Sequence, residues 1–172
     1  MVLIATLVVG SNNATSKGGQ SAPLSTPADR ARFLELHRSA AAIITGRKSA
    51  LVEDYSKTSV PIFVFTRQQE KLAFPHPMME QTIVNENLHE VTRGIESRFV
   101  GNVIIESGVE LLQDLIEVGA VDGLALTISP IEGNGDIIDL AKLLANFSIE
   151  KEVEVDGTRL LECRYHSNSA NR

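Results

Sequence analysis

The sequence predicts a three-layer α/β sandwich, in which helices cover a mixed, mostly parallel central sheet that ends in an antiparallel hairpin. Two observations support this fold class. Short runs of aliphatic and β-branched residues alternate along the chain with segments of helical periodicity, a pattern typical of parallel strands joined by helices. Near the end of the chain, two strand-like segments flank Asp156-Gly157, a dipeptide that favours a type I′ hairpin turn.

Local signals place the individual elements. The first helix begins at Thr26-Pro27, because a hydroxyl residue can cap it, proline suits its first position and Asp29 lies in its first turn. The other helices are expected around Glu86–Ser97, Ser107–Val118 and Asp139–Leu144. The strands are expected at Val2–Val9, Ala41–Thr45, Pro61–Thr66, Asn102–Glu106, Leu124–Ser129, Ile149–Val155 and Thr158–Tyr165.

Composition indicates one globular domain over residues 1–166, followed by a flexible polar tail at 167–172. Of the 172 residues 43% are hydrophobic and 22% are charged, which is ordinary for a globular protein. The net charge of −6 is spread along the chain, so we expect no nucleic-acid partner. The apolar start is too short to span a bilayer, so we expect no membrane partner. The lone Cys163 suits a reducing compartment and predicts a cytoplasmic protein.

Several predicted strands end on residues that suit a phosphate or a ribose. These strand ends are Gly10-Ser11, Thr45-Gly46, Thr66-Arg67 and Glu106-Ser107-Gly108. Because parallel strands present their carboxyl ends at one edge of a sheet, these loops are expected to share one cleft. The chain has neither a P-loop nor the G-x-G-x-x-G fingerprint after its first strand. Two interpretations of Ser107-Gly108 remain: an anion-binding helix start, or a helix cap without a ligand.

Other chemistries have little support in the sequence. The four histidines have no metal-ligand spacing, and a single cysteine does not supply the ligands of a zinc site, so we expect no metal. No serine lies in a nucleophile-elbow motif, which argues against acyl transfer. Arg67 directly follows an apolar strand, where it could bind a 2′-phosphate or could equally be a solvated surface charge.

The chain resembles the pyrimidine reductase family of riboflavin biosynthesis, the RibD C-terminal domain, which has the dihydrofolate-reductase-like fold. The most specific part of the resemblance is "IIESGVELLQDLIEVGAVDGLALTISP", which corresponds to the family's Val-Glu-Gly-Gly-x-x-Leu signature and to the helix and strand that follow it. Earlier, "AIITGRKSALVED" corresponds to a strand followed by Gly-x-x-Thr-x-x-x-Asp-Asp. The resemblance covers nearly the whole chain in the right order.

The resemblance implies that NADPH is the cofactor, with its pyrophosphate held by Gly108 to Asp114 at a helix N-terminus. Together with the strand ends above, the expected cofactor-binding residues are Gly10, Thr45, Gly46, Ser49, Glu53, Thr66, Arg67, Ser107, Gly108, Val109, Glu110 and Leu111.

For the substrate side, the resemblance implies a catalytic pair, Glu106 to orient the substrate and Asn13 beside the sugar. The expected substrate-binding residues are Ser21, Arg30, His37 and Pro130, with the Gly133–Gly135 loop near the nicotinamide. The chain departs from the family pattern here. Asn13 replaces an aspartate, Pro23 a tryptophan, and His37 and Val60 fall where the family has arginines.

The resemblance therefore implies an NADPH-dependent reductase that converts a ribosylamino-pyrimidine phosphate to its ribitylamino form by hydride transfer. The departures leave open reduction of another heterocycle, such as a dihydrofolate-like pterin, or a nucleotide-binding relative without turnover. Family members pair as dimers, and the hairpin carries apolar side chains that need a place to bury. A homodimer is therefore expected, with Val153, Val155, Leu160 and Leu161 covered.

Overall fold

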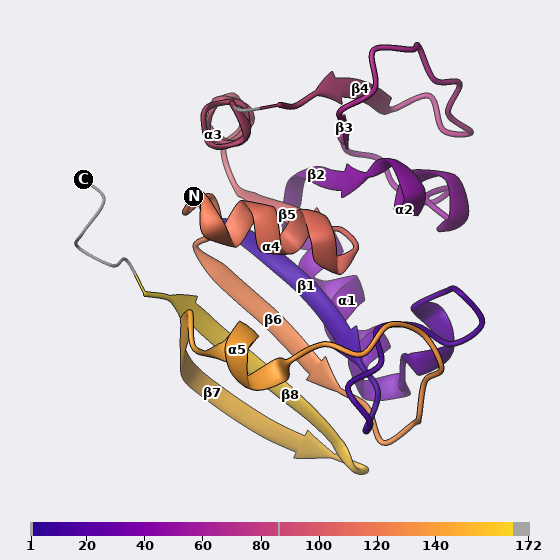
Figure 1. Cartoon of the computed structure of the whole chain (residues 1–172), viewed down its shortest axis with the longest axis vertical. Coiled ribbons are helices and arrows are strands. Elements are labelled where there is room, and N and C mark those ends of the chain that lie inside the picture. Colours follow the sequence, from indigo (N-terminus) through magenta and orange to yellow (C-terminus); the bar gives the residue numbers. More distant parts are fainter. Residues whose placement is uncertain (1, 86, 167–172) are drawn as a thin grey trace.

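The computed structural model describes residues 2–85 and 87–166, and the predicted flexible tail lies outside these residues. The predicted fold class is confirmed: an eight-stranded sheet lies between helices and ends in an antiparallel hairpin (Figure 1). The order of the strands across the sheet is β4-β3-β2-β5-β1-β6-β8-β7. The strands are β1 (Leu3–Val9), β2 (Ala40–Gly46), β3 (Ile62–Thr66), β4 (Met79–Ile83), β5 (Asn102–Glu106), β6 (Gly123–Ile128), β7 (Phe147–Val155) and β8 (Thr158–Tyr165).

The first strand lies in the middle of the sheet, parallel to both of its neighbours. Leu3 of β1 pairs with Val103 of β5, and Ile4 pairs with Gly123 of β6. All pairings from β4 across to β6 are parallel, whereas β8 is antiparallel to β6 and to β7. Because the parallel strands run in one direction, their carboxyl ends meet at a single edge of the sheet.

Two sets of helices cover the two faces of the sheet. The helices are η1 (Ala22–Leu24), α1 (Pro27–Ser39), α2 (Arg47–Val52), α3 (Leu88–Glu96), α4 (Val109–Glu117) and α5 (Leu140–Leu144). Helices α3, α4 and α5 pack in the larger core with Ala42 and Ile44 of β2. Ala50 of α2 packs with Ile43 of the same strand, whose side chain points to the opposite face.

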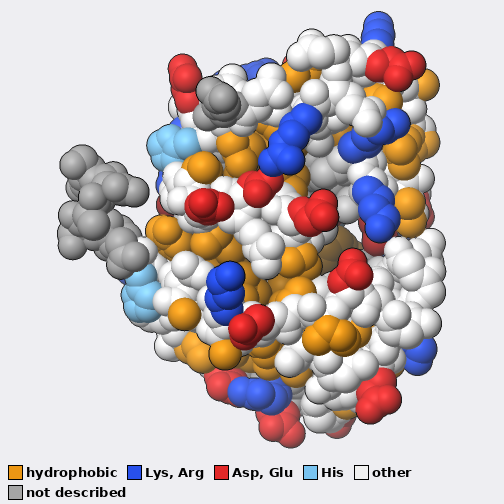
Figure 2. All heavy atoms as spheres, viewed as in Figure 1, with side chains coloured by type: hydrophobic (Ala, Val, Ile, Leu, Met, Phe, Trp, Pro, Cys, Tyr) orange, Lys and Arg blue, Asp and Glu red, His pale blue; other side chains and the backbone are white. Residues whose placement is uncertain are grey.

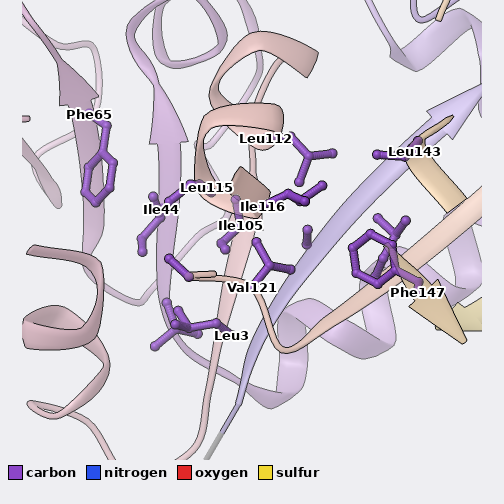
Figure 3. Packing of buried hydrophobic residues seen from close by; sticks show 14 of the residues in the cluster. Leu3, Ile44, Phe65, Ile105, Leu112, Leu115, Ile116, Val121, Leu143 and Phe147 are labelled. Atoms are coloured by element: carbon purple, nitrogen blue, oxygen red, sulfur yellow. The ribbon is translucent and has the colours of Figure 1, made fainter. Parts of the chain in front are cut away.

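Helix α4 forms the centre of the larger core. Its side chains Leu112, Leu115 and Ile116 point to the sheet, where Ile105 of β5 lies beneath them (Figure 3). The apolar residues recur at helical spacing, so one face of α4 is buried and the other carries its charged residues. Burial of each of these side chains stabilises the fold by roughly 1.5–3 kcal/mol. This packing fixes where the amino end of α4 meets the edge of the sheet.

Helix α1 has no buried side chain and is held to the sheet mainly by polar contacts. The Arg32 guanidinium donates to Thr127 Oγ1 at 2.6 Å and to the Leu161 carbonyl at 3.1 Å. Thr127 in turn donates to Asp29. At the start of the helix, Thr26 Oγ1 accepts from the backbone N–H of Asp29 at 3.3 Å, as the predicted cap requires. A polar helix attached in this way leaves room between itself and the sheet.

The C-terminal hairpin has the predicted turn and leaves two valines exposed. Asp156 and Gly157 have φ values of 49° and 75°, as the two central residues of a type I′ turn require. Leu161 is 1% exposed, but Val153 and Val155 are 40% and 41% exposed. Because β7 is the edge strand of the sheet, these valines remain exposed in a single chain, and the homodimer expected to cover them stays a prediction.

Three short elements, η1, α2 and β4, were absent from the predicted set, and helices α3, α4 and α5 begin later than predicted. Helix α4 begins at Val109 because Gly108 is its extended N-cap residue. Helix α3 begins at Leu88, and residue 86, the predicted start, lies outside the described residues. No helix within the described chain is long and apolar enough to cross a lipid bilayer.

Asp122, which precedes β6, links three parts of the fold and predicts a pH-dependent stability. Its carboxylate accepts from the Leu3 backbone N–H at 2.8 Å and from the Arg93 guanidinium at 2.9 and 3.1 Å. Burial raises the pKa of Asp122, but the hydrogen bonds from Arg93 and Leu3 outweigh it, so the pKa lies below its usual value. We expect Asp122→Asn to lower the free energy of unfolding at neutral pH by roughly 1–3 kcal/mol.

The sign of the pH dependence follows from the lowered pKa. The stabilisation by the charged carboxylate is fully present above the unfolded-state pKa, about 3.9, and is lost as the pH falls through the lower folded-state value. Denaturant titrations of both proteins should therefore converge below about pH 4. Glu162→Gln, which removes an exposed pair with Lys151, is the matched control and should change stability little. A constant difference between Asp122→Asn and the parent at every pH would contradict the assignment.

Candidate functional site

One large cleft, with a volume of about 1390 Å³, opens at the carboxyl edge of the parallel strands. The ends of β1, β2, β3 and β5 all contribute to it, and α1 forms one wall. Figure 2 shows the surface hollowed beside the amino end of α4, with side chains of both charges near the rim. The predicted site residues that line the cleft are Ser21, Arg30, His37, Gly46, Ser49, Glu53, Thr66, Arg67, Glu106, Ser107, Gly108, Val109, Glu110 and Leu111.

The Ser107-Gly108 turn connects β5 to α4 inside this cleft. Gly108 is extended, with φ −61° and ψ 162°, and a Cβ built on it would meet no atom within 4 Å. The neighbouring Ser107 Oγ is buried and has no hydrogen-bond partner among the described residues. The first N–H groups of a helix have no intrahelical acceptor, and the helix dipole adds positive potential at this end. The turn therefore has the geometry and the donors to bind an anion such as a pyrophosphate.

Basic side chains gather near the ends of β2 and β3. Arg67 directly follows β3, is largely exposed, and donates to Asp114 Oδ2 of α4 at 2.7 Å. Arg47, which the sequence analysis did not single out, directly follows β2 and bonds to Gln68. The Nε of Arg47 is buried without a partner among the described residues, so it has a donor free for a ligand. The signal that could have identified Arg47 is the one used for Arg67, an arginine directly after an apolar strand.

Arg67 gives a testable prediction about the choice between cofactors. If its guanidinium exchanges Asp114 for a 2′-phosphate, the parent protein should bind NADPH more tightly than NADH. Arg67→Ala should remove most of that preference, by roughly 1–3 kcal/mol, the range for a hydrogen bond to a charged group. Fluorescence titrations with both dinucleotides measure it. Arg159→Ala, which breaks an exposed pair with Glu152, is the matched control and should leave the preference unchanged. Equal affinity of the parent protein for the two cofactors would rule out this role.

A second group of polar side chains surrounds Glu106 at the end of β5. The Glu106 carboxylate pairs with His37 Nε2 of α1, and its own backbone carbonyl accepts from Thr45 Oγ1 at 2.6 Å. Tyr55, another residue that the sequence analysis missed, donates its hydroxyl to Thr45 Oγ1 at 3.0 Å. Burial, followed by the charge of Glu106, raises the pKa of Tyr55, so this hydroxyl stays protonated near neutral pH. The group can orient a polar heterocycle and can hold a proton beside it.

Ser21 and Glu53 also meet in the cleft. Ser21 Oγ donates to Glu53 Oε1 at 3.1 Å, which joins the loop before α1 to the segment after α2. Arg30 stacks over the Phe33 ring, with its guanidinium carbon 5.5 Å from the ring centroid. These contacts place one predicted cofactor residue and two predicted substrate residues on the same wall of the cleft.

Four predicted site positions lie away from the cleft lining. A Cβ on Gly10 would lie 2.6 Å from the Ile131 carbonyl oxygen, so this glycine serves loop packing. Asn13 has φ 61°, and its carbonyl accepts from the Ile138 N–H at 3.1 Å. Pro130 is exposed beside Gly157 of the hairpin turn. Thr45 is fully buried and supports Glu106 from behind.

The predicted nicotinamide-side loop at residues 133–135 also serves loop packing. A Cβ on Gly133 would lie 2.5 Å from the Ser16 carbonyl oxygen, and Gly135 is still closer to the Ser16 side chain. The backbone N–H groups of Asn134 and Gly135 both donate to that carbonyl at 3.0 Å. These glycines bring two loops together at the end of β1 and do not line the cleft. Nowhere in residues 2–85 and 87–166 are three or more potential metal ligands grouped.

Comparison with known protein families identifies the chain. The family model described as the RibD C-terminal domain matches residues 12–136, which include α1, β2, the Ser107-Gly108 turn and β6. The chain belongs to the RibD C-terminal domain family. No curated protein matches the chain.

Solved structures similar to this RibD C-terminal domain have the same fold at low sequence identity. A putative riboflavin biosynthesis protein from Shewanella sp. PV-4 superposes with a TM-score of 0.71 at 14% identity, covering 96% of this chain and 99% of that one. Dihydrofolate reductase from Enterococcus faecalis, solved with NADP(H) and RAB-propyl, gives 0.69 at 17% identity, covering 96% of each chain.

A third similar structure is a larger protein. It is the diaminohydroxyphosphoribosylaminopyrimidine deaminase/5-amino-6-(5-phosphoribosylamino)uracil reductase of Thermotoga maritima, with a TM-score of 0.70 at 13% identity. The match covers 96% of the RibD C-terminal domain described here but only 56% of the Thermotoga chain. At these identities the likeness establishes the fold alone.

Proposed function

We propose that the protein is an NADPH-dependent reductase of a ribosylamino-pyrimidine phosphate, which it converts to the ribitylamino form by hydride transfer. The observation that carries the proposal is the Ser107-Gly108 turn. It opens into the cleft at the start of α4, and the space in front of Gly108 is free of protein atoms. Family membership supports the same function, as does the similarity to a reductase solved with NADP(H). The buried lone Cys163 is consistent with action in the cytoplasm.

In this proposal the turn and the first N–H groups of α4 hold the pyrophosphate. Arg67 and Arg47, at the ends of β3 and β2, lie where they could bind further phosphate oxygens, and Ser49 would add a hydroxyl. The bound dihydronicotinamide supplies the hydride. The part of the cleft lined by Glu106, Ser21 and α1 would hold the substrate, so the protein contributes orientation more than side-chain chemistry.

Binding and turnover test the proposal in two steps. NADPH is expected to bind at micromolar concentration, which the fluorescence of the dihydronicotinamide reports. Addition of 5-amino-6-(5-phosphoribosylamino)uracil should then accelerate the loss of dihydronicotinamide absorbance, and mass spectrometry should detect the ribitylamino product. NADPH binding without oxidation by this pyrimidine would overturn the proposed substrate.

Two further functions are compatible with the site, and the same experiment separates them. Reduction of a dihydrofolate-like pterin is supported by Asp29 and Glu106, two carboxylates in the cleft that could accept from an aminopyrimidine edge. Dihydrofolate is therefore the second substrate to assay. A nucleotide-binding protein without turnover is supported by Asn13 and Val60, which stand where the family has an aspartate and an arginine. Binding with no oxidation in the presence of either substrate would favour that function.

We further propose that two copies pair through the C-terminal hairpin. Val153 and Val155 of β7 are exposed apolar side chains on an edge strand, and a partner could cover them. Light scattering at micromolar concentration should give the mass of a dimer. Val153→Lys should shift it to the mass of a monomer, whereas Val118→Lys, at an exposed valine after α4, should not. A monomeric parent protein would contradict the proposal.

A further inference from the structure

His37 and Glu106 form a carboxylate–imidazole pair between the two sides of the cleft. His37 Nε2, on the last turn of α1, bonds to Glu106 Oε1 at the end of β5. The side chains are 19% and 11% exposed, so the pair is largely shielded from solvent. Glu106 directly precedes the Ser107-Gly108 turn, which places the pair next to the proposed position of the cofactor.

The pair leaves one ring nitrogen of His37 without a protein partner. No described residue bonds to Nδ1, and the ring lines the cleft. The ring also stacks on Phe33, with a centroid distance of 4.1 Å, which fixes its plane. When Nε2–H donates to the carboxylate, a proton added to the ring occupies Nδ1, from which it can be donated to a ligand.

We propose that His37 is the proton donor of the reduction, with Glu106 as the residue that positions its ring. The inference rests on the proposed reductase function. Hydride transfer from a dihydronicotinamide to the carbon of a C=N or C=O bond delivers two electrons and one hydrogen, and leaves the adjacent nitrogen or oxygen in need of a proton. His37 Nδ1–H supplies that proton, so the imidazolium becomes neutral and takes up another proton from solvent before the next turnover. Imidazole suits this step because it changes charge between pH 5 and 8.

Other ionisable groups around the pair contribute to its charge balance. Arg30 and Arg38 lie on α1, and the second of these is paired with Glu35. Tyr55 and Glu53, from the segment after α2, face the Glu106 side. The hydroxyl of Tyr55 stays protonated, because burial and the Glu106 charge raise its pKa. Of the groups that face the pair, the imidazole is therefore the one suited to cycling a proton near neutral pH.

The variant His37→Gln distinguishes two roles of His37: donation of a proton to the substrate, and attachment of α1 to β5 through the hydrogen bond to Glu106. The glutamine amide can still donate to the Glu106 carboxylate, so α1 stays attached to β5, but the side chain cannot carry an acidic proton. We expect kcat with 5-amino-6-(5-phosphoribosylamino)uracil to fall roughly a hundredfold or more, the usual range for losing a general acid. The decline of kcat toward high pH should disappear, while NADPH affinity and melting temperature stay near the parent values. His89→Gln, at an exposed histidine of α3, is the matched control and should change none of these.

A measurement without turnover tests the same assignment. In the complex with oxidised NADP⁺ and the pyrimidine, no hydride is available, and ¹⁵N NMR can follow the His37 ring. We expect the Nδ1 resonance to shift when the pyrimidine is added, because this nitrogen then bonds to the ligand.

The outcomes distinguish this inference from the function on which it rests. An active parent protein combined with an equally active His37→Gln variant, or an unchanged Nδ1 resonance, overturns the role of His37 and leaves the reductase function standing. A parent protein that binds NADPH but oxidises it with neither the pyrimidine nor dihydrofolate overturns both. Loss of folding in His37→Gln would assign the pair a structural role and contradict the proposal.

Discussion

Gly108→Val should abolish dinucleotide binding while leaving the protein folded. The valine side chain would project into the space in front of the turn, where no protein atom lies within 4 Å of the new Cβ. It would therefore occupy the volume that a pyrophosphate needs to reach the backbone N–H groups of α4. Loss of these charge-assisted hydrogen bonds corresponds to about 3 kcal/mol, or roughly a hundredfold in affinity for NADPH. Fluorescence titration measures the affinity.

The cost to stability should be small, which makes the experiment decisive. Gly108 has an extended backbone with negative φ, so valine can adopt it, and valine at a helix N-cap costs roughly 1 kcal/mol or less relative to glycine. Gly94→Val on α3 is the matched control, because a Cβ there also meets open space but lies outside the cleft. A folded Gly108→Val protein with normal NADPH affinity would refute the anion-binding turn. Loss of stability in Gly108→Val alone would assign this glycine a packing role.

Glu106→Gln should lower turnover strongly and affect cofactor binding little. Its carboxylate is largely buried beside His37, and a neutral amide would neither position the His37 ring nor orient a substrate donor in the same way. We expect kcat to fall by roughly a hundredfold or more. The affinity for NADPH should stay within a few-fold, because the turn that would bind the pyrophosphate begins at the next residue. Steady-state kinetics with the pyrimidine, beside a direct NADPH titration, separate the two quantities.

A matched control keeps this prediction specific to the cleft. Glu35→Gln makes the same change on α1, where the carboxylate pairs with exposed Arg38 and does not line the cleft. Its kcat should equal that of the parent protein. If Glu106→Gln retained full turnover, Glu106 would have no catalytic part, and the proton-donor role of His37 would lose its support as well.

Long, strongly patterned elements could be predicted from the sequence, and short polar ones could not. Strand β5 and the buried face of α4 follow from apolar residues at the expected spacing. Helix α2 has only six residues and follows a glycine N-cap that offers no capping side chain, so no local signal marks it. Strand β4, "MEQTI", lies at the edge of the sheet and is partly polar, so it lacks the pattern of a buried strand.

The parts of the candidate site that could be predicted are those whose residues are adjacent in the sequence. The Ser107-Gly108 turn could be found because a strand, a turn and a helix start are contiguous there. The pairing of His37 with Glu106 and the support from Tyr55 depend on contacts between distant segments, which spacing along the chain does not indicate. Gly10 and Asn13 follow a strand end as the pattern requires, yet packing of the loop against the Ile131 region draws them away from the cleft.

The position of β1 has a consequence for the order in which the protein folds. The first strand of the chain lies between β5 and β6, and it alone joins the β4-β3-β2-β5 half of the sheet to the β6-β8-β7 half. Its partner strands, β5 and β6, are synthesised only after more than half of the chain, because Leu3 pairs with Val103 and Ile4 with Gly123. A ribosome-bound chain must therefore keep an apolar segment unpaired for much of its synthesis. Such a high contact order predicts slow folding and a period in which this strand is vulnerable to aggregation or to capture by a chaperone.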